Sequence, residues 1–345
     1  MASIPAIAVD GMGGDFAPEP VVGGVALALA ELGDRVRICL VGDRERLMPL
    51  LEKYNLAGHS CLEVVNAPEV IGMDEHPASA VRTKRKSSIN VAADLVKAGD
   101  CAGLFTAGNT GAAVAATFLK WRMLQGIERP AIAAALPKTD GGRFLLLDAG
   151  ATVDCTPRNL AQFAIMGDIF AKLILGMAVP NVGLLSNGTE PGKGNRLTQE
   201  SFSLLREINC LSFRGNVEGH DLFSPEVDVV VCDGFVGNVV LKTSESLAKA
   251  IGKMVKEQIC SKAIWKAGGL LCKGAFEVIK KSSDASEVGG APLLGVRGTC
   301  LIGHGRADAK AVCNGIKGVL NIIDTQVNEH IVEQIHEYGL DGVLA

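Results

Sequence analysis

The strongest constraint on the fold is a strand–turn–helix pattern that recurs along the chain. In Val229–Lys242 (VVVCDGFVGNVVLK), an apolar run enters a Gly- and Asn-rich turn, and a helix-like segment follows. A run without polar alternation predicts a strand that is buried on both faces. Gly103–Lys120 repeats the pattern, and Val182–Arg206 is a looser version. Three such turns indicate one ligand site at the carboxyl edge of a parallel sheet. Glycine turns and helix N-termini favour an anionic ligand, such as one that carries phosphate.

Strand-like and helix-like segments alternate over most of the 345 residues, which predicts a three-layer α/β fold with a mostly parallel sheet. A chain of this length can form one large unit or two coupled lobes. Because no linker or fixed-period repeat marks a boundary, we expect residues 1–345 to form a single α/β unit. We expect Ala78–Lys97 to be largely helical, and Ala307–Tyr338 to be helical in two pieces that separate near Gly315 and Gly318.

Composition argues against several classes of protein. The net charge is −4 and no basic stretch is interleaved with aromatics, so nucleic acid is not an expected partner. The ten cysteines form no C-x-x-C pair, which is typical of small buried residues in a reducing compartment. The first residues lack the features of a signal peptide, and no apolar run approaches the ~20 residues of a membrane span. We therefore expect a cytoplasmic enzyme that could still touch a membrane surface.

The absence of several catalytic motifs limits the types of reaction that we expect from this chain. The sequence has no H-E-x-x-H zinc motif, P-loop or G-x-S-x-G elbow, and Gly11–Gly14 does not match the dinucleotide turn. The polar turns suit the attack of phosphate on an activated acyl group, which needs a cation and N–H donors but no covalent nucleophile. Lys193 could supply the cation, and Asn109 and Asn238 the amide donors. Each residue taken alone also suits ordinary turn chemistry or a solvated loop.

Two further clusters are candidates for binding or catalysis. If the segment around residues 82–86 is helical, Arg82, Arg85 and Lys86 share one face. That face suits phosphate or an acidic partner, and the alternative is a solvated surface. A Gly-rich apolar run ends beside His304, whose imidazole is either an acid/base group or a structural residue.

Thr243–Lys281 is a basic, amphipathic segment unlike the rest of the chain. Its apolar side chains fall on one helical face, and residues 242–281 hold nine lysines against three glutamates. This composition favours an interfacial membrane anchor or a dock for an acidic partner. The alternative is an amphipathic core helix with a solvated lysine face. The residues expected to make the contacts are Lys253, Lys256, Ile259, Ile264, Trp265, Leu270 and Leu271.

Eight segments, taken together, resemble the PlsX-type phosphate acyltransferases of bacterial phospholipid synthesis. They occur in the family's order and cover essentially the whole chain. They are Val9–Asp15 (VDGMGGD), Arg82–Ser88, Ala107–Ala112 (AGNTGA), Leu147–Ala151 (LDAGA), Gly188–Asn195 (GTEPGKGN), Phe213–Gly219 (FRGNVEG), Asp233–Asn238 (DGFVGN) with Leu241 and Lys242, and Gly289–Gly295 (GGAPLLG).

The resemblance implies an α/β fold akin to the isocitrate/isopropylmalate dehydrogenase superfamily and a homodimer. It implies reversible transfer of a fatty acyl group from acyl-[acyl carrier protein] to inorganic phosphate, without an organic cofactor or metal. It also implies a peripheral membrane enzyme, with its membrane contact at about residues 238–281, that supplies acyl phosphate to a glycerol-3-phosphate acyltransferase. The resemblance implicates Lys193 and Asn238 in activity. We expect substrate contacts from Asp10, Gly13, Gly14, Asp15, Arg82, Lys86, Asn109, Thr110, Asp233 and His304.

The chain departs from the family pattern at two places beside the expected site. Thr152 stands where the family usually has asparagine, and Ser186-Asn187 replaces the more usual Asn followed by a hydrophobe. Both changes bear on local hydrogen bonding. Two alternative functions stay open: a phosphate acetyltransferase that acts on acyl-coenzyme A, and a non-catalytic membrane-associated scaffold.

Overall fold

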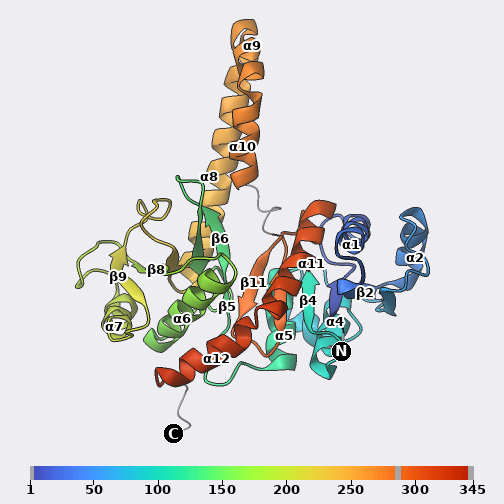
Figure 1. Ribbon diagram of the computed structural model, residues 1–345, viewed down its shortest axis with the longest axis horizontal. Helices are drawn as coiled ribbons and strands as arrows, with labels where there is room; N and C mark the ends of the chain where they lie inside the picture. Colours follow the sequence, from blue (N-terminus) through green and yellow to red (C-terminus); the bar gives the residue numbers. More distant parts are fainter. Residues whose placement is uncertain (1–3, 284–288, 341–345) are drawn as a thin grey trace.

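The computed structural model describes residues 4–283 and 289–340 and shows an α/β body from which a helical hairpin projects (Figure 1). The described strands form two sheets. The larger sheet consists of β3 (Leu62–Asn66), β2 (Arg37–Gly42), β1 (Ala6–Asp10), β4 (Gly103–Thr106), β12 (Thr299–Ile302), β11 (Ala291–Leu294) and β5 (Ala131–Ile132), in that order. The smaller sheet consists of β6 (Ala134–Pro137), β7 (Arg143–Leu147), β10 (Val229–Val231), β8 (Asn181–Leu185) and β9 (Ser212–Val217).

The expectation of an α/β fold with mostly parallel strands is confirmed. Only the pairs that involve β11 and the β6–β7 pair are antiparallel among the described strands. The expected sheet is divided into two, because the chain leaves β5 and enters β6 after the single residue Ala133. The N–H of Ala133 donates to the carbonyl oxygen of Pro292 at 3.0 Å. The two sheets therefore adjoin at this crossing.

Helices cover both faces of the larger sheet. On β1, Ile7 and Val9 belong to the core shared with α1 and α11, whereas Ala6 and Ala8 belong to the core shared with α4 and α5. This division follows from the alternation of side chains along a strand. The helices of the body are α1 (Glu19–Leu32), α2 (Arg44–Lys53), α3 (Pro77–Thr83), α4 (Ser88–Ala98), α5 (Thr110–Trp121), α6 (Pro157–Leu173), α7 (Arg196–Leu205), α11 (Ala309–Asp324) and α12 (Val327–Glu337), with a 3-10 turn at Gly33–Arg35.

The polar turns that follow the strands begin the helices. Asp233 caps α8 (Gly234–Ser261) by accepting from the N–H of Val236 at 2.9 Å, and Asn109 caps α5 by accepting from the N–H of Ala112 at 3.1 Å. Asn195 caps α7 in the same way. Such caps satisfy N–H groups that have no intrahelical partner. The strand–turn–helix pattern in all three segments is thereby confirmed.

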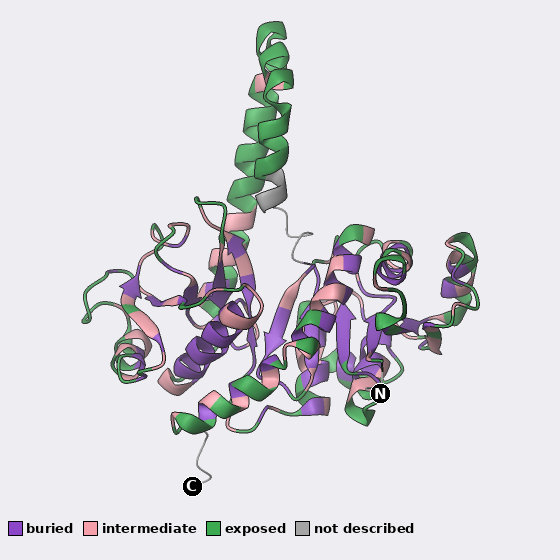
Figure 2. Ribbon diagram, viewed as in Figure 1, coloured by how far each residue is buried: buried purple, intermediate pink, exposed green. Residues whose placement is uncertain are grey.

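The basic segment forms a hairpin that stands away from the body. It comprises α8 (Gly234–Ser261), α9 (Ala263–Leu271) and α10 (Lys273–Ser283), and Figure 2 shows it exposed over most of its length. On α8, Leu247 is 58% exposed and Met254 is 65% exposed. The alternative of a core helix is therefore wrong for this segment. In the described part of the chain, no helix combines the length and the apolar character needed to cross a bilayer.

Two expected helices differ from the structure. The helix expected over residues 78–97 is divided into α3 and α4 by a turn at residues 84–87. The C-terminal break lies at Gln326, which has a φ of 51°, and not near Gly315. Gly315 sits inside α11, where any Cβ would overlap the ring of Phe105. Glycine at this position lets α11 pack closely against the sheet. In the sequence, such a glycine cannot be told from one that ends a helix.

Candidate active site

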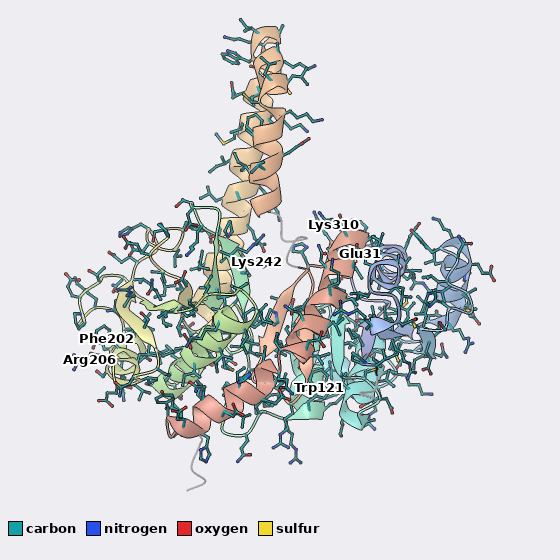
Figure 3. The ribbon with its side chains drawn as sticks, viewed as in Figure 1. Glu31, Trp121, Phe202, Arg206, Lys242 and Lys310 are labelled. Carbon is teal, nitrogen blue, oxygen red and sulfur yellow. The ribbon has the colours of Figure 1, made fainter. Side chains whose placement is uncertain are left out.

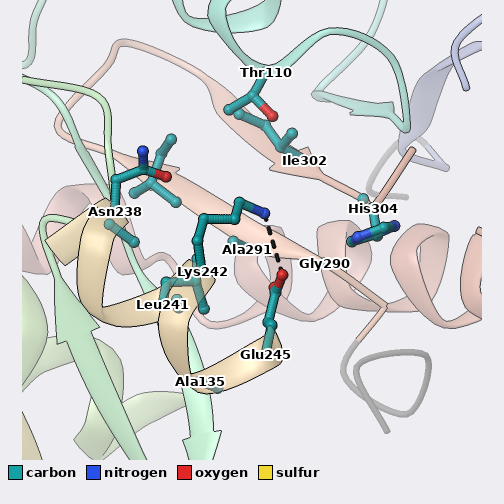
Figure 4. A pocket seen from close by; sticks show the side chains of 14 residues that line it. Thr110, Ala135, Asn238, Leu241, Lys242, Glu245, Gly290, Ala291, Ile302 and His304 are labelled. Atoms are coloured by element: carbon teal, nitrogen blue, oxygen red, sulfur yellow. Dashed lines mark hydrogen bonds and ion pairs between the residues drawn. The ribbon is translucent and has the colours of Figure 1, made fainter. Parts of the chain in front are cut away.

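A cavity of about 170 Å³ lies where the two sheets adjoin. The β5–β6 crossing, the end of β12 and the start of α8 all contribute to its walls (Figure 4). It brings together three of the residues expected from the sequence: Asn238, Thr110 and His304. The remaining residues that line it are Ile132, Ala134, Ala135, Ala149, Leu241, Lys242, Glu245, Gly290, Ala291, Ile302 and Gly303.

One face of α8 presents polar groups to this cavity. Asn238 and Lys242 are one helical turn apart, and Glu245 lies a further turn along. Figure 4 shows Lys242 and Glu245 extending from the helix to meet at their charged ends, with Nζ 3.3 Å from Oε2. The sequence analysis included Lys242 in the strand–turn–helix pattern, in a family segment and, with Glu245, in the charge count of residues 242–281, but it proposed neither as a site residue. Their spacing from Asn238 was the signal that could have found them.

The opposite wall carries the start of α5 and the loop that follows β12, which contains Gly303 and His304. Thr110 is the first residue of α5, whose N-terminus carries partial positive charge. The Nδ1 atom of His304 accepts from the N–H of Arg306 at 3.1 Å. A neutral His304 ring therefore carries its proton on Nε2. The cavity thus offers an amide, a hydroxyl, an imidazole and an ammonium group around one space.

The turn at Gly11–Asp15 braces the site but does not line the main cavity. The buried carboxyl of Asp10 accepts from Thr106 Oγ1 at 2.7 Å and from the N–H of Met12 at 3.2 Å. Burial raises the pKa of Asp10, although hydrogen bonds, including those from Ser88 and Thr106, oppose that rise. A Cβ on Gly13 would come within 2.7 Å of both Asp10 Oδ2 and the Gly108 nitrogen. This turn is therefore pressed against the turn that begins α5.

The same turn also supports the loop that carries His304. The N–H of Asp15 donates to the carbonyl oxygen of Gly305 at 2.7 Å, and the Asp15 carboxylate lies 3.4 Å from Arg306. Gly14 faces Gly305 as well. Substrate contact by Asp10, Gly13, Gly14 and Asp15 stays a prediction. In the structure these residues contact neighbouring turns.

Asn109 and Asp233 serve as helix caps. Besides capping α5, the Asn109 amide donates to the carbonyl oxygens of Gly72, Met73 and Glu75 at 3.0–3.3 Å. Its donors are thus occupied in holding the loop before α3, and its contact with substrate stays a prediction. Asp233 holds the first turn of α8 and so fixes the direction in which Asn238 points.

The expected basic helical face does not form. α3 ends at Thr83, and Lys84 instead pairs with Glu75 at 2.6 Å. Arg85 and Lys86 then lie in the turn before α4, so they share no helix with Arg82. The predicted shared face of Arg82, Arg85 and Lys86 was therefore wrong. Lys84 bonds to Glu75 and to the carbonyl oxygen of Val70 in the neighbouring loop, and α3 ends before it. Arg82 and Lys86 are exposed, and their role as phosphate contacts stays a prediction.

Lys193 is exposed on the loop that follows β8 and is not among the residues that line the cavity. Its backbone N–H donates to Glu190, and its side chain folds against Gly188. Because β8 and β10 are parallel neighbours, this loop and the Asp233 turn share one edge of the smaller sheet. The catalytic role expected for Lys193 stays a prediction.

The two departures from the family pattern are accommodated locally. The buried Asp148 carboxylate accepts from the N–H groups of Ile132, Gly150, Ala151 and Thr152 at 2.6–3.0 Å. The Thr152 hydroxyl donates to the carbonyl oxygen of Pro130 at 2.8 Å. On the other loop, Asn187 Oδ1 accepts from the N–H of Gly194 at 2.9 Å. Thr152 and Asn187 therefore stabilise the turns in which they stand, whereas the buried Oγ of Ser186 has no hydrogen-bond partner in the described part of the chain.

A larger groove of about 560 Å³ borders the cavity. Gly111 and Gly150 line the groove, and their neighbours Thr110 and Ala149 line the cavity. Its apolar lining includes Pro77, Val114, Ala115, Phe118, Pro130 and Val153.

Among the described residues, no three His, Cys, Asp or Glu side chains gather as a metal site requires.

Comparison with known proteins gives consistent results. A phosphate acyltransferase from Leptospira biflexa is 45% identical over 334 residues, which is 96% of this chain and 97% of that protein. A phosphate acyltransferase from Geotalea uraniireducens is 48% identical over 331 residues, or 96% and 94% of the two chains. The fold is similar to that of a phosphotransacetylase from Streptococcus pyogenes, with a TM-score of 0.60, 15% identity and 95% coverage of both chains.

The family described as "Fatty acid synthesis protein" matches residues 6–330. This range contains both sheets, the cavity and the hairpin. On this match and on the near full-length similarity to its relatives, the chain belongs to the fatty acid synthesis protein family.

Proposed function

We propose that this protein transfers a fatty acyl group reversibly from acyl-[acyl carrier protein] to inorganic phosphate, which yields acyl phosphate and free carrier protein. The observation that carries the proposal is the meeting of Asn238, Thr110 and His304 at one cavity beside an apolar groove. The names of the relatives, which are phosphate acyltransferases, support the same reaction. Phosphate is anionic at neutral pH and can attack without a covalent nucleophile.

In this reaction a phosphate oxygen bonds to the thioester carbon, and the carbon–sulfur bond breaks. The thiolate then leaves with the carrier protein and takes a proton from solvent. The Asn238 amide and the Thr110 hydroxyl orient the carbonyl and the phosphate, and the N-terminus of α5 favours the anion. The bordering groove accepts the acyl chain. Lys193, from the adjacent loop, reaches phosphate or the carbonyl when substrate is bound.

The test is incubation of the purified protein with palmitoyl-[acyl carrier protein], with and without phosphate, followed by trapping with hydroxylamine. Acyl hydroxamate that forms only with phosphate is the expected result. No product from this thioester but product from acetyl-coenzyme A would favour a phosphate acetyltransferase. No product from either thioester would favour a non-catalytic scaffold.

We further propose that the hairpin docks the acidic carrier protein, an anionic membrane surface, or both. Support comes from exposed apolar and basic side chains on the same helices, which Figure 3 shows standing away from the body. Ile264 is 77% exposed and Leu271 is 89% exposed, while Ile259 is half-buried against Gly269. Lys262 lies over the ring of Trp265, with Nζ 4.2 Å from its centroid. Such a surface suits an interface that is apolar and anionic.

The remaining elements of the proposal follow from the family resemblance. The protein is a cytoplasmic homodimer, peripherally attached to the membrane, with one α/β catalytic unit per chain. Its fold is akin to the isocitrate/isopropylmalate dehydrogenase superfamily. Its acyl phosphate is consumed by a glycerol-3-phosphate acyltransferase.

A further inference from the structure

Lys242 lines the cavity between the two sheets, and the reaction steps proposed above give it no role. Among the described residues of the lining, it is the only lysine or arginine. Its side chain extends from α8 into the cavity and meets Glu245 there, with Nζ and Oε2 separated by 3.3 Å (Figure 4). The pair is part of the cavity wall, and Lys242 lies at the base of the hairpin (Figure 3).

The surroundings make this ammonium group suitable for an anion. The wall beside it includes the apolar residues Ile132, Leu241 and Ile302. The Lys242 side chain itself is 58% exposed, so its ammonium is open to an anion that arrives from solvent. The start of α5 lies across the cavity, where Thr110 and Gly111 supply the first N–H groups of the helix. Helix geometry gives such N–H groups no intrahelical acceptor, and they favour negative charge.

We propose that Lys242 binds the attacking phosphate, opposite the N-terminus of α5. Before phosphate arrives, the ammonium pairs with Glu245, and phosphate then takes the place of that carboxylate. This inference rests on the proposed function, because it identifies which cation receives the phosphate in that reaction. Lys193 is then left to act from the edge of the smaller sheet, on the thioester.

Titration calorimetry with inorganic phosphate alone tests the assignment on the full-length protein. Lys242→Gln should weaken phosphate binding roughly 10- to 100-fold, since a charged hydrogen-bond donor is lost. Lys242→Arg keeps the charge and should recover part of the affinity. The matched control is Lys249→Gln, an exposed lysine two turns further along α8, which should bind phosphate as the wild type does. Glu245→Gln removes a nearby negative charge and should leave phosphate binding equal or tighter.

Steady-state kinetics provides the second measurement. Lys242→Gln should raise the KM for phosphate by a similar factor while the KM for acyl-[acyl carrier protein] changes little. Unchanged phosphate affinity and unchanged phosphate KM in Lys242→Gln would refute the assignment and leave the proposed function standing. If the wild type binds phosphate through Lys242 but forms no acyl phosphate, the assignment stands and the proposed function fails. A wild type that neither binds phosphate nor shows activity overturns both.

Discussion

Gly237 provides a sharp test of how α8 is held in the site. A Cβ at this position would overlap the carbonyl oxygen of Asp148, lie 2.9 Å from the Asp148 carbonyl carbon and lie 3.0 Å from Cys232 Sγ. Two of these atoms belong to the backbone at the end of β7 and cannot rotate away. Asn238 follows directly, so the close approach of α8 to Asp148 sets where its amide lies.

Two effects oppose each other in Gly237→Ala. Alanine favours the helix over glycine by about 1 kcal/mol, whereas overpacking a rigid site costs about 1–3 kcal/mol. Because the new methyl group would overlap backbone atoms, we take the upper end of the cost. We expect the free energy of unfolding to fall by about 2 kcal/mol. A displacement of Asn238 by about 1 Å should also lower the rate of acyl phosphate formation on the order of 100-fold.

Gly252→Ala is the matched control because it makes the same change in the same helix. A Cβ at Gly252 meets nothing within 4 Å, and the residue is exposed. This variant should be more stable by about 0.5–1 kcal/mol, with unchanged activity. Urea unfolding and the hydroxylamine assay measure both variants. If Gly237→Ala matched Gly252→Ala in stability and rate, the reasoning about this contact would be refuted.

Four other outcomes follow from the structure. Lys193→Ala should lower turnover roughly 10- to 100-fold with an unchanged circular dichroism spectrum, and near-normal turnover contradicts its role. Because burial raises the pKa of Asp10, the folded state binds the extra proton. The free energy of unfolding of the wild type, relative to Asp10→Asn, is then greatest below about pH 4 and falls as pH rises through the pKa of folded Asp10. Urea titrations in which this difference increases with pH would contradict the reasoning. Ala115→Trp should lower kcat/KM for palmitoyl far more than for butyryl thioesters by filling the groove, whereas equal losses would place the chain elsewhere. Anionic vesicles or acidic carrier protein should protect the exposed Cys260 and Cys272 from a thiol reagent, and added salt should weaken this protection. Labelling that does not depend on salt would argue against docking at the hairpin.

The sequence was most informative where a local pattern determines a local structure. Asp233 and Asn109 follow buried strands, and both cap the next helix as such residues do. That pattern was enough to place Asn238 and Thr110 at carboxyl edges, and the cavity brings them together. The helical character of residues 243–281 was also foreseeable from the spacing of the apolar side chains. Whether that apolar face was buried stayed open until the structure showed the exposed hairpin.

The rest depends on how distant segments pack. The division into two sheets occurs at Ala133, and nothing in the neighbouring residues marks that crossing. The prediction of a basic helical face at residues 82–86 was wrong because Lys84 pairs with Glu75, which comes from another loop. The spacing of the apolar residues around Lys242 predicts that it lies in a helix. That its side chain faces the start of α5 across the cavity depends on packing, which the sequence does not give.

The measurement that tests the central claim most directly is a comparison of acyl donors. Acyl phosphate formation is followed with palmitoyl-[acyl carrier protein], palmitoyl-coenzyme A and acetyl-coenzyme A at equal concentrations and saturating phosphate. The proposed function predicts a kcat/KM for the carrier-protein thioester that exceeds both coenzyme A thioesters, with no product when phosphate is omitted. Equal or greater activity with acetyl-coenzyme A, or product that does not require phosphate, would contradict it.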